Sequence, residues 1–279
     1  MNRKGVFFLA LALSTFALGQ DVPQDCAPMV AAIGAPKYQG DPPDHTVLCR
    51  IGYVLSHNTD HKTPDWTVER LTPDRFKKAT SRQSLGNPFA PDPDLKPGQR
   101  SELKDYRGSG YDRGHMAPAG SMVFDEQAMI QSFYLSNMTP QVGKGMNQGI
   151  WAKLEEMTRD WACERGEVIV MTGPIYDNDK PKTIGDDKVA VPTAFYKIAY
   201  APSSKRAIAF ILPNKSIDLK GRKPWDVLKT YVVSVRDVQE RTGLDFLSAL
   251  PARDESRLEG TRSVMWPQRK VCKSDLLQR

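Results

Sequence analysis

Alternating and continuous apolar stretches mark the strands that the chain is expected to form. Residues 47–56 are mostly apolar and predict a first strand, and residues 66–71 alternate between apolar and polar at period two, as a half-buried strand does. We expect these two strands to pair antiparallel. Residues 72–99 contain many prolines and basic side chains without a sustained apolar pattern, which predicts a long surface loop.

The second half of the chain carries the most strongly apolar strand pattern. Residues 168–174 form a nearly continuous apolar run that closes on a Gly-Pro pair, so we predict a strand in the centre of the sheet. Residues 191–200 and 207–212 predict two further strands joined by a turn, and residues 231–235 are a candidate for another.

A regular apolar spacing predicts a long helix over residues 147–164. Four core-facing side chains recur at spacings of four, three and four: Ile150, Leu154, Met157 and Trp161. Gly166 is expected to end this helix. On a wheel of about 100° per residue, three polar residues share a separate stripe that spans roughly a third of a turn: Asn147, Glu155 and Arg159. One rigid helix would therefore direct three polar side chains toward one place.

Shorter elements complete the expected fold. Asp125 is a predicted N-cap for a helix that runs to Gln131, and residues 133–135 predict a buried strand after it. Residues 237–241, followed by Gly243, predict another short helix. Strands in runs with few helices between them favour an α+β domain with a mostly antiparallel sheet. No Rossmann or P-loop glycine fingerprint is present, which argues against dehydrogenases and nucleoside triphosphatases.

The N-terminus has the pattern of a targeting segment. Residues 1–19 begin with Arg3 and Lys4, continue with an apolar run and end on small residues, which predicts a secretory signal peptide. The apolar run is shorter than the about 20 residues that a membrane-spanning helix needs. We therefore expect a periplasmic or secreted protein without stable membrane association. The remaining chain would form an extended segment at 20–44 and one domain with a C-terminal tail at 45–279.

Charge and cysteine content narrow the picture further. The formal charge is +6 and falls to +4 without the two basic residues of the leader, which is compatible with a polyanionic partner but does not identify one. An even number of cysteines in an exported chain predicts two disulfides, and the lack of a CxxC spacing argues against structural zinc. Of three possible pairings, proximity favours Cys26 with Cys49 and Cys163 with Cys272.

One short stretch combines the residue types of phosphodiester chemistry. Residues 111–118 bring together Asp112, Arg113 and His115. Imidazole can take and give a proton near neutral pH, and a guanidinium fork matches phosphate oxygens. By itself, a tetrapeptide of this kind is equally compatible with a hydrogen-bonded histidine in a loop.

The tetrapeptide 112–115, Asp-Arg-Gly-His, resembles the signature of the DNA/RNA non-specific endonucleases, the ββα-metal (His-Me finger) nucleases that include endonuclease G. Residues 136–141 (SNMTPQ) and 146–155 (MNQGIWAKLE) resemble further segments of that family in order and spacing. The resemblance extends over roughly residues 45–250. It implies an α+β fold with a ββα-metal finger, and Mg²⁺-dependent hydrolysis of DNA and RNA to 5′-phosphorylated products.

The resemblance also implies roles for individual residues. His115 would be the general base that deprotonates water, which requires a neutral imidazole and a partner that holds its tautomer. Asn147 would be the only direct protein ligand of a hydrated Mg²⁺ (or Mn²⁺), and Glu155 would hold waters of that ion. Candidate phosphate clamps are Arg113, Arg159 and Arg82, with Arg75 as the alternative to Arg82 and an ordinary salt bridge to Glu155 as the alternative for Arg159.

Other acids and histidines are weaker candidates for a metal site. His57 and His61 have the spacing of a helical zinc pair, but a nearby proline indicates a turn. Four aspartates lie in loops with proline or glycine, where solvated turn acids are expected: Asp92, Asp94, Asp186 and Asp187.

Two rival functions and two further partners stay open from the sequence. The chain could be a non-catalytic exported protein that binds or takes up nucleic acid, or a phosphodiesterase for a small or lipid-linked diester. Besides DNA and RNA, a second copy of the chain in a homodimer and an inhibitor protein are candidate partners.

Overall fold

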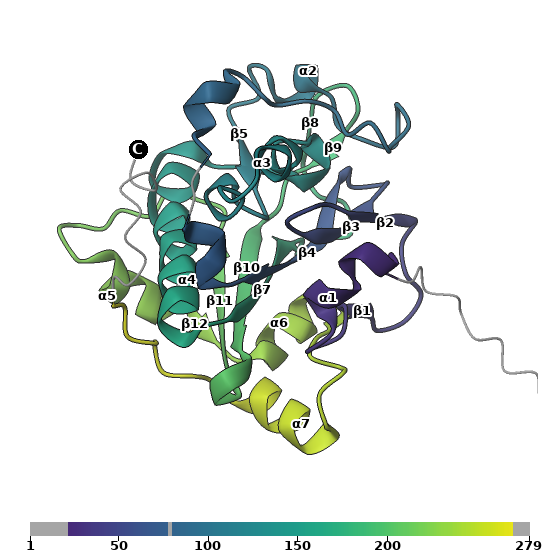
Figure 1. The fold of residues 1–279 in the computed structure, drawn as a ribbon. Helices are drawn as coiled ribbons and strands as arrows, with labels where there is room; N and C mark the ends of the chain where they lie inside the picture. Colours follow the sequence, from purple (N-terminus) through teal and green to yellow (C-terminus); the bar gives the residue numbers. More distant parts are fainter. Residues whose placement is uncertain (1–21, 78–79, 270–279) are drawn as a thin grey trace, which may run out of the picture.

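Seven antiparallel strands form the central sheet of the protein (Figure 1). The computed structural model describes residues 22–77 and 80–269. The strand order is β12-β11-β10-β7-β4-β3-β2, and every neighbouring pair is antiparallel. The strands are β2 (His45–Cys49), β3 (Val54–Asn58), β4 (Thr63–Leu71), β7 (Val168–Ile175), β10 (Ala194–Ala201), β11 (Arg206–Pro213) and β12 (Val232–Val233). The predicted α+β class with a mostly antiparallel sheet is confirmed.

The strand predictions are correct in the centre of the sheet and wrong at one edge. All residues of β7 are buried between β4 and β10, as the continuous apolar run predicts. The strand expected at 47–56 is instead a hairpin of β2 and β3, closed by a hydrogen bond from the Arg50 N–H to the Tyr53 carbonyl at 2.9 Å. Gly52 fits this turn because a Cβ there would lie 2.1 Å from Met122 Sδ. The turn, Arg50–Tyr53, lacks the Asn-Gly or Asp-Gly pair that marks a hairpin in a sequence, so the two strands look like one.

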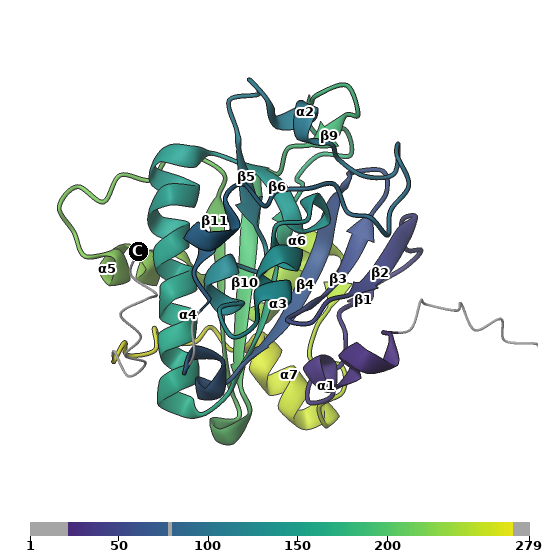
Figure 2. The ribbon, with the colours of Figure 1, turned by 45° about the horizontal axis from the view of Figure 1, so that its top comes forward.

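Helices cover both faces of the sheet (Figures 1 and 2). On one face lies α4 (Ala152–Arg165), whose predicted apolar residues Leu154, Met157 and Trp161 are buried in the larger core. On the other face, a second core contains side chains of α1 (Ala27–Val30), α6 (Val235–Thr242) and α7 (Ala252–Gly260). Burying apolar surface on both faces explains why the central strands read as continuous apolar runs.

A small two-stranded sheet and the helix that follows it form a ββα unit. Strand β5 (Asp112–His115) pairs antiparallel with β6 (Met138–Gln141), so that His115 lies opposite Met138. A kinked helical segment, Gly143–Trp151, leads from β6 into α4. The helix expected to run without interruption from Asn147 is therefore wrong at its start, because the backbone leaves helical geometry at Gly149 (φ −128°, ψ −112°).

The shorter elements agree with the sequence in part. Helix α3 (Glu126–Ser132) begins as predicted at Asp125, whose side chain accepts a hydrogen bond from the Ala128 N–H at 2.8 Å. The strand predicted at 133–135 is wrong, because the Phe133 N–H bonds the Ile130 carbonyl at 3.0 Å and a 3-10 turn, Leu135–Asn137, follows.

Near the C-terminal end, α6 confirms the helix predicted at 237–241 and ends at Gly243, which has a φ of 66°. The remaining short elements are α2 (Leu103–Tyr106), α5 (Pro224–Leu228) and the two-stranded pairs of β1 (Lys37–Tyr38) with β13 (Leu244–Asp245) and β8 (Thr183–Ile184) with β9 (Val189–Ala190).

The N-terminal segment is tied to the sheet by a disulfide between Cys26 and Cys49, as predicted, with the two Cα atoms 5.7 Å apart. The segment contains α1 and is not extended throughout, since Val30 and Ile33 pack in the second core. Cys163 is also disulfide-bonded, but its predicted partner Cys272 lies outside the described residues, as does the predicted leader.

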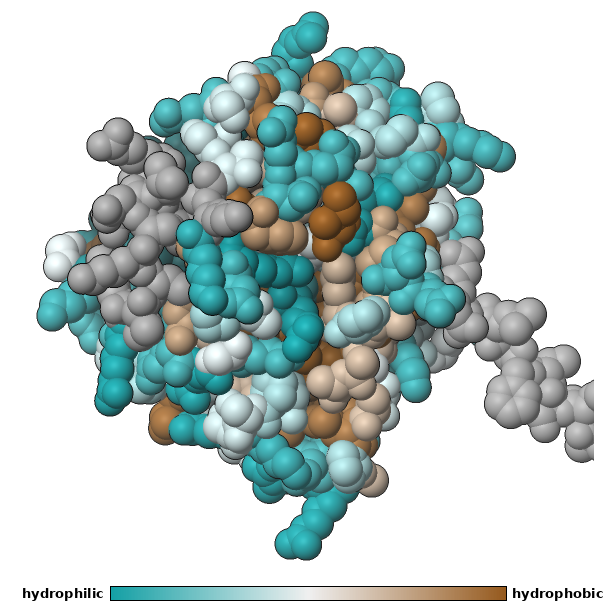
Figure 3. Space-filling view, viewed as in Figure 1, coloured by the Kyte–Doolittle hydropathy of each residue, from teal (hydrophilic) through white to brown (hydrophobic). Residues whose placement is uncertain are grey.

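The surface shows no broad apolar area in the view of Figure 3, where hydrophobic residues lie scattered among hydrophilic ones. Among the described residues, the exposed large hydrophobic side chains are those of Ile51 and Val264. No helix in the described part of the chain has the length and apolar character needed to cross a membrane.

Candidate active site

A cavity of about 750 Å³ lies beside the ββα unit. Its wall includes all six side chains that the sequence singles out: Arg82, Arg113, His115, Asn147, Glu155 and Arg159. They come from a 3-10 turn, Arg82–Leu85, from β5, from the kinked segment and from α4. Residues up to 77 positions apart thus meet around a single volume.

His115 lies at the end of β5, half-buried in the wall of the cavity. Burial and the positive charges of Arg82 and Arg113 lower the pKa of its imidazole to about 3. The ring is therefore neutral at pH 7. Its Nε2 atom is buried and has no hydrogen-bond partner among the described residues, so the partner expected to hold the tautomer is not found for this nitrogen.

Two phenylalanine rings pack against the histidine ring. The centroids of Phe133 and His115 are 4.9 Å apart with an interplanar angle of 86°, and those of Phe89 and His115 are 5.8 Å apart. The two phenylalanines meet each other edge to face at 5.0 Å. The imidazole is therefore packed against two aromatic rings, of which Phe89 lines the cavity and Phe133 is fully buried.

The same rings support two of the candidate arginines. The guanidinium carbon of Arg113 lies 4.0 Å from the ring centroid of Phe89, and that of Arg82 lies 4.9 Å from that of Phe133. Arg75, the alternative to Arg82, does not line the cavity. Its Nη1 donates to the Gly52 carbonyl at 3.0 Å. The geometry therefore places Arg82, and not Arg75, in the site.

The side chain of Asn147 is held by Asp112. The sequence analysis gave this acid of the motif no role of its own. The Nδ2 atom of Asn147 donates to Asp112 Oδ2 at 2.8 Å, and Gln148 Nε2 donates to the same oxygen at 2.8 Å. Gly143 makes room for this acid, because a Cβ there would lie 2.8 Å from Asp112 Oδ1. With Nδ2 turned to Asp112, the amide oxygen of Asn147 is the atom left for a cation.

Glu155 and Arg159 lie one turn apart on α4, and both line the cavity. No salt bridge joins them within the described residues, so the alternative reading of Arg159 as a plain i,i+4 partner is not supported. Burial raises the pKa of Glu155 to about 7, against the lowering effects of Lys197 and Arg159. Gly120 leaves space for the guanidinium, since a Cβ there would lie 3.0 Å from Arg159 Nη1.

Two charged residues of the central sheet, Lys197 and Glu69, are buried, and the sequence analysis did not identify them. Lys197 on β10 and Glu69 on β4 are each only 1% exposed. Lys197 Nζ donates to Thr172 Oγ1 on β7 at 2.6 Å and lies 4.8 Å from the Trp151 ring centroid. Burial raises the pKa of Glu69 and lowers that of Lys197, while their mutual attraction opposes both shifts. These charges also act on Glu155, which lies above them on α4.

The weaker metal candidates do not form a site. His57 Nε2 is hydrogen-bonded to the Gln99 carbonyl at 2.9 Å, while His61 packs against Tyr176 with 4.2 Å between ring centroids. Asp92 is not the solvated turn acid that was predicted, because it is fully buried and accepts two hydrogen bonds from Arg50 at 2.6 and 2.7 Å.

Asp94, Asp186 and Asp187 fit the expectation of loop acids better than Asp92. Asp94 is 58% exposed and bonds Arg50 at 2.8 Å. Asp186 and Asp187 both pair with Lys104, at 3.7 and 3.6 Å. None of them lines the 750 Å³ cavity.

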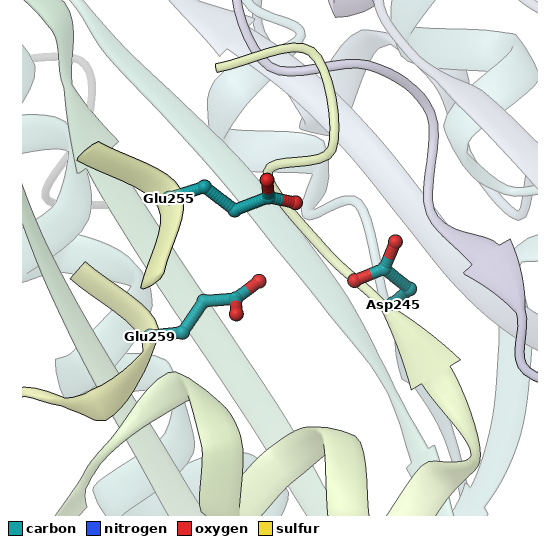
Figure 4. Close-up of side chains that lie close together, drawn as sticks. All are labelled: Asp245, Glu255 and Glu259. Carbon is teal, nitrogen blue, oxygen red and sulfur yellow. The ribbon is translucent and has the colours of Figure 1, made fainter. Parts of the chain in front are cut away.

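A cluster of three acids lies apart from the cavity, between β13 and α7 (Figure 4). Oxygen atoms of Asp245, Glu255 and Glu259 lie within 4.8 Å of one another. Gln239 Nε2 bridges the cluster by donating to Asp245 at 3.1 Å and to Glu259 at 3.2 Å. Burial and the two neighbouring acids raise the pKa of Glu259 to about 7. The amide donor of Gln239 and the raised pKa of Glu259 are compatible with the close approach of these acids.

Sequence comparison identifies the family of similar proteins. The sequence model of the DNA/RNA non-specific endonuclease family matches residues 32–253. Nuclease C1 of Cunninghamella echinulata var. echinulata is 41% identical over 214 residues, which are 73% of this chain and 83% of that protein. The mitochondrial nuclease of Saccharomyces cerevisiae is 34% identical over 242 residues (80% and 71%), and the mitochondrial endonuclease G of Caenorhabditis elegans is 33% identical over 228 residues (77% and 72%).

A solved structure has the same fold. The crystal structure of an EndoG/EndoGI complex, whose title concerns the mechanism of EndoG inhibition, superposes with a TM-score of 0.73. It is 31% identical in sequence, and the match covers 87% of this chain and 99% of that one.

The names of the yeast and nematode relatives contradict the predicted periplasmic or secreted location, since both are mitochondrial. The misreading has a physical source. A basic start without acidic residues is a property that transit peptides share with secretory leaders. The residues that carry this pattern lie outside the described part of the chain.

Proposed function

Because the chain belongs to the family of DNA/RNA non-specific endonucleases, we propose that it hydrolyses phosphodiester bonds of both DNA and RNA, with Mg²⁺ held in the 750 Å³ cavity, to 5′-phosphorylated products. The observation that carries this proposal is the convergence of a neutral histidine, an oriented asparagine and three arginines on one volume. Phosphodiester hydrolysis needs a base, a cation and groups that neutralise phosphate charge.

His115 is the general base in this proposal. A neutral imidazole can accept the proton of the attacking water, and His115 is neutral at pH 7. A base with a pKa of about 3 would be weak, but two nearby arginines contribute to that value. A bound phosphate would offset their charge and raise the pKa of His115, so the substrate itself would strengthen the base.

The residues of the cavity fit a magnesium ion. Mg²⁺ prefers oxygen ligands and keeps several waters. The Asn147 amide oxygen would be its direct ligand, Glu155 would hold its waters, and Asp112 would keep the amide in this orientation. When bound, the ion would neutralise charge on the phosphate and on the leaving 3′-oxygen. Mn²⁺ has similar ligand preferences and is expected to substitute.

Arg82, Arg113 and Arg159 would hold the phosphate oxygens. Guanidinium groups stay charged at every relevant pH and donate in the plane of the fork. Contacts to phosphate carry no base information, so cleavage is expected to show little sequence preference. An inhibitor protein is part of the proposal because the similar solved structure is that of an EndoG/EndoGI complex. A homodimer stays an expectation from the sequence.

The test is a cleavage assay with three substrates: plasmid DNA, RNA and a small chromogenic diester, each with Mg²⁺ and with chelator. The proposal expects Mg²⁺-dependent loss of both DNA and RNA, at a rate that falls by about 10²-fold to 10⁴-fold in the matched variant His115→Ala. A protein that only binds nucleic acid would retard plasmid in a gel without cutting it. A small-molecule phosphodiesterase would turn over the chromogenic diester alone. Either result would replace the proposal.

A further inference from the structure

Within the described residues, no hydrogen bond to the buried Nε2 holds the ring of the proposed base. A general base must keep one orientation and one tautomer, and His115 Nε2 has no hydrogen-bond partner among the described residues. Its contacts in the wall of the cavity are aromatic: Phe133 at 4.9 Å and Phe89 at 5.8 Å between ring centroids. The orientation of the imidazole must therefore come from packing.

The two phenylalanines contact more than the histidine. Each one also carries a guanidinium group on its ring: Arg113 at 4.0 Å from the centroid of Phe89 and Arg82 at 4.9 Å from that of Phe133. Because the two rings are perpendicular and 5.0 Å apart, they form one unit, which we call the phenylalanine pair. Three of the six candidate site residues rest on this pair.

We propose that the phenylalanine pair, Phe89 and Phe133, is a positioning element that holds His115, Arg113 and Arg82 in their working arrangement. This inference rests on the proposed function of the same cavity and adds two residues to it. Neither phenylalanine touches the proton or the phosphate, so both act through the residues that they support.

The chemistry of aromatic rings explains how one pair can hold three such groups. A ring face carries negative potential and attracts a guanidinium ion, while ring edges are positive and favour edge-to-face contact with another ring. Stacking occupies the flat face of a guanidinium and leaves its N–H donors free in the plane for phosphate oxygens. The same rings exclude water from the buried side of His115, and the charges of Arg82 and Arg113 act on its imidazole.

The backbone holds the two rings together independently of substrate. Phe89 lies in the loop before α2, and Phe133 is fully buried at the end of α3. The Ala90 N–H donates to the Phe133 carbonyl at 3.4 Å, and the Leu135 N–H donates to the Ala90 carbonyl at 2.9 Å. These two bonds flank an isolated bridge between Ala90 and Tyr134. The loop is therefore fastened to α3 at the point where the rings meet.

The test replaces each ring by an apolar side chain without a π face. In Phe89→Leu and Phe133→Leu, kcat on DNA should fall by about 10-fold to 100-fold, the scale expected when catalytic groups are misplaced. Phe89→Tyr keeps the ring at a half-buried position and should restore most of the rate. The matched control is Phe246→Leu, since Phe246 is also fully buried and packs at 5.5 Å against Tyr196 on the opposite face of the sheet.

A second measurement separates this inference from the proposed function. The imidazole NMR signals of His115 can be assigned among the four histidines by comparison with His115→Ala and followed as a function of pH. Phe133→Leu should raise the His115 pKa by at least one unit, because the ring opens to water and Arg82 loses its support, whereas Phe246→Leu should leave it unchanged. This readout holds even if the wild-type protein cuts neither DNA nor RNA, a result that would overturn only the proposed function.

The inference fails if Phe89→Leu and Phe133→Leu lose no more activity than Phe246→Leu at equal thermal stability and keep the wild-type His115 titration. Phe89→Leu keeps the test decisive if Phe133→Leu does not fold, because Phe89 is only partly buried.

Discussion

The amide of Asn147 donates a hydrogen bond to the carboxylate of Asp112 at 2.8 Å. The two residues lie in different elements of the fold. Asp112 is the first residue of β5, and Asn147 lies in the kinked segment before α4. The bond joins the motif that carries the proposed base to the residue that is proposed to bind the ion. Its consequence is that the orientation of the metal ligand depends on an acid that binds no metal itself.

Replacing Asp112 should therefore weaken metal binding without removing a ligand. In Asp112→Ala the Asn147 amide can rotate, and the affinity for Mg²⁺ should fall by about 10-fold to 100-fold, as it does when outer-sphere partners of metal ligands are lost. Gln148→Ala is the control, since it removes the other donor to the same oxygen and leaves the Asn147 bond in place. Calorimetric titration with Mg²⁺ measures both. Equal affinities in wild type and Asp112→Ala would show that the bond does not orient the ligand.

Removing one of the buried charges of the central sheet should lower the free energy of unfolding. Lys197→Ala removes a buried positive charge that acts on two buried acids, Glu155 and Glu69, and we expect a loss of about 3–5 kcal/mol in the free energy of unfolding. Lys153→Ala is the comparison, because Lys153 forms an exposed pair with Glu156 at 2.9 Å, and such pairs contribute about 0–1 kcal/mol. Urea unfolding measures both. A loss below 1 kcal/mol for Lys197→Ala would mean that Glu69 does not need this partner.

The cluster around Glu259 should make stability depend on pH. Its folded pKa of about 7 lies above the ordinary value of a glutamate, so the folded protein binds more protons than the unfolded chain between these two values. The contribution of Glu259 to the free energy of unfolding is fully present below about pH 4.5 and is lost as the pH rises toward 7. Glu259→Gln keeps an oxygen for Gln239 and removes the titration. It should be about 1–3 kcal/mol more stable than wild type at pH 8, with little difference at pH 4.5.

Thermal and urea unfolding of both proteins across this pH range measures the effect. Because Glu155 titrates in a similar range, the difference between the two proteins isolates Glu259 from the wild-type slope. Parallel curves for wild type and Glu259→Gln would refute a raised pKa at this position.

The His115 pKa should respond to an anion in the site. Arg82 and Arg113 lower it when no phosphate offsets their charge, so saturating inorganic phosphate or a short non-cleavable nucleotide should raise it by at least one unit. The imidazole titration by NMR provides the measurement, with Arg75→Ala as a control because Arg75 does not line the cavity. If the His115 pKa does not change when the anion is saturating, the anion does not bind close enough to His115 to act on its charge.

The parts of the fold that depend on the local spacing of apolar residues could be predicted from the sequence. The apolar spacing of Leu154, Met157 and Trp161 identifies the buried face of α4, and Gly166 ends the helix with a φ of 81°. The kink at Gly149 was not readable, because a glycine inside a helical pattern is compatible with either a straight or a broken helix.

The misread parts depend on contacts between distant residues. Residues 133–135 look like a short apolar strand, yet Phe133 and Tyr134 continue the turns of α3, and Tyr134 pairs with Ala90 only in an isolated bridge. Asp92 looks like a loop acid until Arg50, which is 42 residues away, supplies its partner. Lys197 was not singled out from the sequence, because a lysine within a strand gives no sign that the sheet is covered on both faces at that position.

The sequence motifs identified the candidate site residues. They did not identify the residues that hold these side chains in place. His115, Asn147, Glu155 and Arg159 meet in one cavity as expected. Asp112 belongs to the motif, but the sequence gives no sign that it orients Asn147, or that the phenylalanine pair supports His115. Only the folded arrangement shows which groups they orient.

The division of labour between His115 and Asn147 is the central claim, and calorimetric Mg²⁺ titration combined with DNA cleavage tests it most directly. His115→Ala should lose about 10²-fold to 10⁴-fold in cleavage rate and keep nearly wild-type Mg²⁺ binding, because it removes only the base. Asn147→Ala should lose both, and added Mg²⁺ should restore part of the rate for this variant alone. If His115→Ala abolishes Mg²⁺ binding while Asn147→Ala leaves it unchanged, then His115 is the metal ligand and the account is wrong.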